Sequence, residues 1–162
     1  MIVVSNSSPL ISLSAIRQSH LLPALFQEII IPQAVYDEIV FGEDRAGTSE
    51  VKNADWIQTQ RVKNSRAAKQ LAASAKLDLG ESEAIVLARE LKADHLLLDD
   101  LAARKAAHRK RLPVTGTLGV LLLAKNAGLI PEVAAPMREL IAAGKYVDPI
   151  VYREILLKAG EL

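Results

Sequence analysis

Leu96-Leu97-Leu98-Asp99-Asp100 joins three apolar residues directly to two adjacent carboxylates, and a helical pattern opens immediately afterwards at Leu101. This order predicts a buried parallel strand that carries acid to its carboxyl end. In open α/β sheets the ligand site lies in the crevice just outside those strand ends. One Asp at such a place often caps the following helix. A second carboxylate favours a functional site, because a helix start needs only one cap.

The same strand-to-helix unit recurs along the chain. Strands are expected at 2–5, 29–31, 56–62, 96–98 and 113–115, with the third one exposed or at an edge. Helices are expected from Pro9, at 21–26, from Pro32, and at 65–76, 81–91, 101–111, 117–126, 137–143 and 149–158, with a polar loop at 41–53. The strand cores are apolar throughout instead of alternating, which is typical of a parallel α/β sheet covered on both faces.

Size and composition limit the classes of protein that fit. A chain of 162 residues without repeats or a composition shift predicts a single domain spanning 1–162. No apolar run is long enough to span a bilayer, and the first residues lack a signal-peptide pattern, so a cytoplasmic location is expected. The absence of cysteine excludes thiol chemistry. With 20 basic against 19 acidic residues, any nucleic-acid binding must come from local patches.

Acids and an amide follow strands or begin helices in four separate segments. They are Asn6, Glu38, Glu81, Glu83, Asp99 and Asp100. Right-handed crossovers would bring these segments to one edge of the sheet. Oxygen donors without His or Cys suit Mg²⁺ or Mn²⁺ and argue against zinc. Each acid alone is a weak signal, because Glu81 and Glu83 also favour a helix amino terminus through the helix dipole.

The chain resembles the PIN domain superfamily in five blocks that follow one another in order. They read VVSNSSPLI from Val3, IPQAVYDEI from Ile31, LGESEAI from Leu79, LLDDLAAR from Leu97 and VTGTLGVL from Val114. Within the superfamily the chain is most similar to VapC-like proteins of the DUF3368 group. The resemblance implies a three-layer α/β/α fold, with a parallel sheet of four to five strands in the order 3-2-1-4-5. It also implies a Mg²⁺- or Mn²⁺-dependent ribonuclease, often the toxin of a type II toxin–antitoxin pair, with RNA, a small antitoxin and a second copy of the chain as partners.

Carried over by block, the PIN acids fall on named positions of this sequence. The first is Asn6, the second Glu38, the third Glu83 or Glu81, and the fourth Asp100 or Asp99. Asn6 departs from the pattern, because an amide oxygen can coordinate a cation but brings no charge. An alternative function follows, in which a catalytically weak or inactive PIN-like protein binds RNA or a partner without cutting.

Basic residues and late apolar residues suggest surfaces for partners. Arg104, Lys105, His108, Arg109, Lys110 and Arg111 follow the acidic pair and could hold RNA phosphates. Alternatively they form a solvated face whose cations complement the carboxyl end of a helix. Thr117 could line the site or cap the next helix. Apolar residues between 147 and 157 would suit a dimer or antitoxin contact.

Two other α/β functions fit poorly. In a phosphoacceptor receiver domain the acidic pair should follow the first strand, where this chain has Asn6, and a Lys should follow the last strand. Dinucleotide or P-loop binding would need a glycine-rich phosphate loop, and neither pattern is present.

Overall fold

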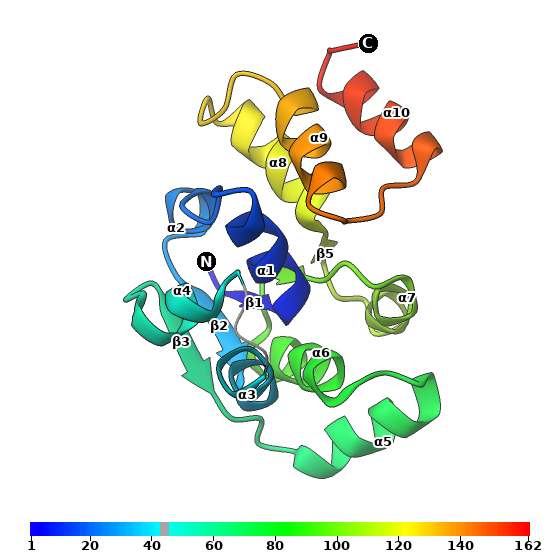
Figure 1. Cartoon of the computed structure of the whole chain (residues 1–162). Helices are drawn as coiled ribbons and strands as arrows, with labels where there is room; N and C mark the ends of the chain where they lie inside the picture. The colour runs from blue at the N-terminus through cyan, green and yellow to red at the C-terminus, as the bar shows by residue number, and fades with distance from the viewer. Residues whose placement is uncertain (43–45) are drawn as a thin grey trace.

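The computed structural model describes residues 1–42 and 46–162, and it shows strands and helices alternating along the chain (Figure 1). The strands are β1 Val3–Ser5, β2 Ile29–Pro32, β3 Ile57–Gln60, β4 His95–Leu97 and β5 Val114–Thr115. The first helices are α1 Ser7–Ala15, α2 Leu21–Phe26, α3 Gln33–Phe41, α4 Thr48–Asn53 and α5 Ser65–Ala75. The later ones are α6 Leu79–Leu91, α7 Leu101–Arg109, α8 Thr117–Asn126, α9 Ala134–Ala142 and α10 Pro149–Lys158.

The five strands form one parallel sheet in the order β3-β2-β1-β4-β5. Val4 of the central strand pairs with Ile30 on one side and with Leu96 on the other. The predicted parallel α/β class and the strand order implied by the resemblance are both confirmed, and β3 is an edge strand as expected. Parallel strands point the same way, so all five carboxyl ends meet at one edge.

Both faces of the sheet are covered, which explains the uninterrupted apolar strands. Val3 and Leu97 pack into one core with residues of α1, α2, α3 and α8, whereas Val4 and Leu96 pack into a second core with α6 and α7. In Figure 1 the helices α1, α2 and α8 lie on one side of the strands, and α6 on the other, with α5 outside it. The result is the three-layer arrangement that the resemblance implied.

Several predicted boundaries were wrong for local reasons. The expected loop at 41–53 contains α4, although residues 43–45 lie outside the described part of the chain. The third helix begins after Pro32, which ends β2, and the first begins at Ser7, before Pro9. Helix α9 begins three residues earlier than expected.

The start of α6 was also misplaced. The helix begins at Leu79 rather than Glu81, because Asp78 and Glu81 form a capping box in which each side chain accepts from the other residue's backbone N–H. The spacing Asp-x-x-Glu is the sequence signature of this motif, so the signal was present in the chain.

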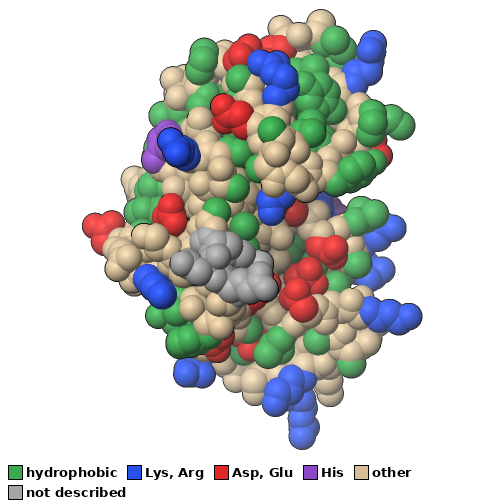
Figure 2. All heavy atoms as spheres, in the orientation of Figure 1, with side chains coloured by type: hydrophobic (Ala, Val, Ile, Leu, Met, Phe, Trp, Pro, Cys, Tyr) green, Lys and Arg blue, Asp and Glu red, His purple; other side chains and the backbone are tan. Residues whose placement is uncertain are grey.

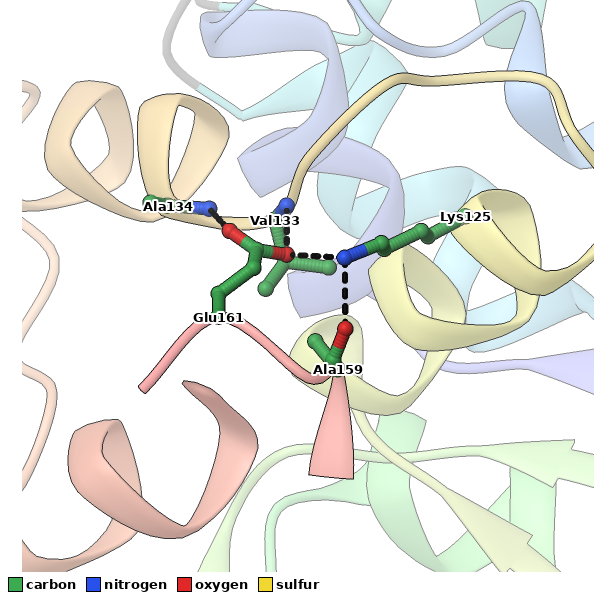
Figure 3. A network of polar contacts seen from close by, with 5 residues as sticks. All are labelled: Lys125, Val133, Ala134, Ala159 and Glu161. Carbon is green, nitrogen blue, oxygen red and sulfur yellow. Dashed lines mark hydrogen bonds and ion pairs between the residues drawn. The ribbon is translucent and has the colours of Figure 1, made fainter. Parts of the chain in front are cut away.

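The end of the chain is held by a half-buried carboxylate (Figure 3). Glu161 accepts from the N–H groups of Val133 and Ala134 at the start of α9 and from Lys125 Nζ of α8, at 2.8 Å. Lys125 Nζ also donates to the carbonyl of Ala159, just after α10. One acid therefore ties α8, α9 and the end of α10 together.

No helix in the described part of the chain is long and apolar enough to cross a bilayer.

Candidate functional site

Asn6 and Glu38 come together at the carboxyl edge because a glycine lets a helix approach them. Asn6 directly follows β1, and its backbone N–H donates to the carbonyl of Leu97 on β4 at 3.0 Å. A Cβ added at Gly80, in the first turn of α6, would lie 3.5 Å from Asn6 Oδ1 and 3.3 Å from Glu38 Oε2. The two oxygens therefore face the same small space below the amino terminus of α6.

Glu81 and Asp100 extend this group across the edge. Burial raises the pKa of Glu81 to about 7, and the negative charges of Asp78, Asp100 and Glu38 add to the increase, against the hydrogen bond from Asp78 N–H. Glu81 therefore lies in the field of its own helix cap, Asp78, and of acids from two other segments, and it holds its own charge poorly near neutral pH. We call Asn6, Glu38, Glu81 and Asp100 the acid group. Figure 2 shows acidic side chains gathered on the face turned to the viewer, with Lys and Arg along its lower and right-hand edges.

Glu83 and Asp99 are used to hold other helices. Glu83 Oε1 accepts from the N–H of Ala34, in the first turn of α3. Asp99 accepts from the backbone N–H and the hydroxyl of Thr117, at 2.7 and 2.6 Å, and so fixes the start of α8. Asp100 has a capping role too, because it accepts from Ala103 N–H at the start of α7. Each Asp of the pair thus accepts hydrogen bonds at the start of a different helix.

Comparison with protein-family models identifies the family of the chain. The family model DUF3368, a PIN domain, matches residues 2–161. The chain belongs to the PIN domain family. PIN domains are generally nucleases and typically use divalent metals, so membership supports a nuclease as the broad class of activity. No curated protein and no solved structure matches the chain significantly.

The acid group has the donor chemistry of a divalent-metal site but not its closed geometry. Within residues 1–42 and 46–162, no three His, Asp or Glu side chains are close enough together to hold an ion as they stand. The donor chemistry nevertheless fits. Among the described residues, no hydrogen-bond partner reaches the buried Asn6 Oδ1, which is costly for a polar atom unless an ion or water satisfies it. Carboxylate and amide oxygens are also the ligands that Mg²⁺ and Mn²⁺ prefer.

The residues predicted to touch RNA divide into three groups. Thr117 is buried and its hydroxyl donates to Asp99, so it is placed to fix the start of α8 at the sheet edge rather than to contact RNA. His108 and Arg109 lie in the last turn of α7, where they complement the helix dipole as the alternative interpretation held, and Lys105 is exposed. Arg104 differs, because its side chain turns back to the strand end and Nη1 donates to the carbonyl of Leu98 at 3.1 Å.

Proposed function

We propose that this PIN protein is a Mg²⁺- or Mn²⁺-dependent endoribonuclease. The observation that carries the proposal is the convergence of the acid group at the carboxyl edge of the sheet, around a buried amide oxygen that has no partner in the described part of the chain. Clustered carboxylates repel one another, and a divalent cation relieves that repulsion. A phosphodiester is the substrate class that gains most from such a site.

The ion would be held by all four residues of the acid group, Asn6, Glu38, Glu81 and Asp100. The ion would supply a water of lowered pKa and would neutralise charge on the phosphodiester oxygens. Glu38 and Asp100 bring charge from the two sides of β1, and the neutral amide of Asn6 favours Mn²⁺ over Mg²⁺, because the softer ion tolerates that donor better. Glu83 and Asp99 accept from α3 and α8, and neither is among the charges that raise the pKa of Glu81, so they are assigned to positioning these helices instead of to the ion.

The experiment compares two carboxylates that each cap a helix. Asp100→Asn keeps an acceptor for the start of α7 and removes the charge, and Asp148→Asn does the same at the start of α10. Purified proteins are incubated with a labelled single-stranded RNA and Mn²⁺. We expect cleavage by wild type and by Asp148→Asn, and loss of cleavage in Asp100→Asn. Equal rates in all three would remove Asp100 from the site and point to a contaminating nuclease.

The biological role extends the same proposal. We place the protein in the cytoplasm as the toxin of a type II toxin–antitoxin pair, forming a homodimer that a small antitoxin covers. The support is the family resemblance and the exposure of Tyr146, Ile150 and Leu157 on and beside α10. A neighbouring reading frame without an antitoxin-like product would oppose the toxin role, and a monomer by light scattering would oppose the dimer.

A second function is favoured by Asn6. A missing carboxylate weakens the attraction for the ion, so the protein would bind RNA or a partner without cutting it. Metal binding and RNA binding by wild type, with no cleavage at any Mn²⁺ concentration, is the result that would favour this function over the ribonuclease.

A further inference from the structure

Arg104 lies near the amino terminus of α7, where a positive charge does not stabilise the helix. Asp100 caps α7, which places Arg104 in the first turn, near the positive end of the helix dipole. A cation there is electrostatically unfavourable, unlike His108 and Arg109 in the last turn. Another interaction must therefore explain the position of its guanidinium group.

The guanidinium group is held against the edge of the sheet. Nη1 donates to the carbonyl of Leu98, and the side chain is half-buried. A Cβ added at Gly116, just after β5, would lie 2.5 Å from Arg104 Nη1 and 3.0 Å from Asp99 Oδ1. Gly116 has an extended backbone, so its value here is the space that it leaves for the guanidinium group and for Asp99.

The guanidinium group of Arg104 has more hydrogen-bond donors than the described residues offer acceptors. A guanidinium group carries five N–H donors in a planar fork, and in the described part of the chain only the carbonyl of Leu98 accepts from it. Asp99 makes its two hydrogen bonds to Thr117, and no ion pair joins it to Arg104 among the described residues. Within residues 1–42 and 46–162, this half-buried cation at the carboxyl edge of the sheet thus lacks an anion.

The order of charges along the edge indicates which anion fits. Glu38 and Asn6 follow β2 and β1, Asp99 and Asp100 follow β4, and Arg104 lies beside them toward β5. We propose that Arg104 binds the phosphate of single-stranded RNA that lies over the acid group. This inference rests on the proposed ribonuclease function, and it assigns the β5 side of the edge to holding the strand. The planar fork suits two phosphate oxygens at once, which a Lys cannot match.

The test separates binding from cleavage. The proteins are wild type, Arg104→Ala, Arg104→Lys and a control, Arg89→Ala, whose exposed side chain lies in the last turn of α6, at the opposite end from Glu81. Binding of a fluorescein-labelled single-stranded RNA is measured by anisotropy in EDTA over a range of salt concentrations, and cleavage is measured with Mn²⁺. Thermal unfolding checks that each variant folds.

We expect Arg104→Ala to weaken RNA binding about fivefold and to lower the salt dependence by about one phosphate contact. It should lower kcat about 100-fold, as loss of a charge-stabilising donor does. Arg104→Lys should recover most of the binding and little of the rate, and Arg89→Ala should match wild type. Unchanged affinity and salt dependence in Arg104→Ala, or an unchanged kcat, would overturn the assignment. If wild type cleaves no RNA, the ribonuclease proposal fails, and the EDTA binding series still decides the role of Arg104.

Discussion

Replacing Asn6 with Asp should lower the thermal stability of the metal-free protein and raise that of the metal-bound protein. The new carboxylate would replace a buried amide that is only 3% exposed. Because Asn6 Oδ1 and Glu38 Oε2 lie 3.5 and 3.3 Å from the same point at Gly80, they are within about 7 Å of each other. At an effective dielectric constant of about 20, two charges at that separation repel by about 2 kcal/mol.

That repulsion sets the size of both effects. Without metal at pH 8, above the pKa of about 7 of Glu81, Asn6→Asp should lower the melting temperature by about 4–8 °C. With a divalent ion the same charge becomes attractive, so the Kd for Mn²⁺ should fall at least about tenfold. The rate of RNA cleavage should rise with it.

The assay pairs calorimetric titration of Mn²⁺ with thermal unfolding in EDTA and in Mn²⁺. Asn64→Asp is the matched control, because Asn64 caps α5 just as Asn6 stands at the cap position of α1, away from the acid group. The control should change neither the affinity nor the metal-induced shift. An unchanged melting temperature in EDTA together with an unchanged Mn²⁺ affinity in Asn6→Asp would refute the placement of Asn6 in the acid group.

Three further predictions follow from single carboxylates. Folding raises the pKa of Glu81 to about 7, so between pH 4.5 and 7 the native state binds a proton that the unfolded state has lost, and its stability falls as pH rises through that range. The affinity for Mn²⁺ should increase over the same range. Glu81→Gln, which keeps the capping box, should make both the stability and the Mn²⁺ affinity less dependent on pH, as calorimetry will measure. Asp100→Ala should lower the free energy of unfolding by about 1 kcal/mol through loss of the α7 cap, whereas Asp100→Asn should not, as urea denaturation will measure. Burial acts to raise the pKa of Glu161, but hydrogen bonds from Lys125, Val133 and Ala134 outweigh it and hold the pKa below its usual value. This stabilisation is complete above the unfolded-state pKa and is lost as pH falls through the folded-state value; Glu161→Gln should therefore cost about 1–2 kcal/mol at pH 7, and the difference from wild type should vanish in acid.

The layers of the fold were readable from local sequence. Apolar runs such as Ile29-Ile30-Ile31 and Leu96-Leu97-Leu98 predict strands buried on both faces, and helix patterns follow each of them. The order of the strands came from the family resemblance instead, because no local pattern says which strands are neighbours. The helix α4 was missed because its six residues, Thr48–Asn53, are mostly polar and bury only Thr48 and Val51.

The chain by itself determined which segments carry acid to the edge, since a strand followed by a helix places the intervening residues at its carboxyl end. Only the tertiary structure decided which group each acid of a pair meets. Glu81 and Glu83 lie two residues apart on α6, so they point in different directions, and the packing of α6 against α3 sends Glu83 to Ala34 and leaves Glu81 near Asp100. Likewise Asp99 is taken by Thr117 only because β5 lies beside β4, a contact between residues 18 apart that no local pattern encodes.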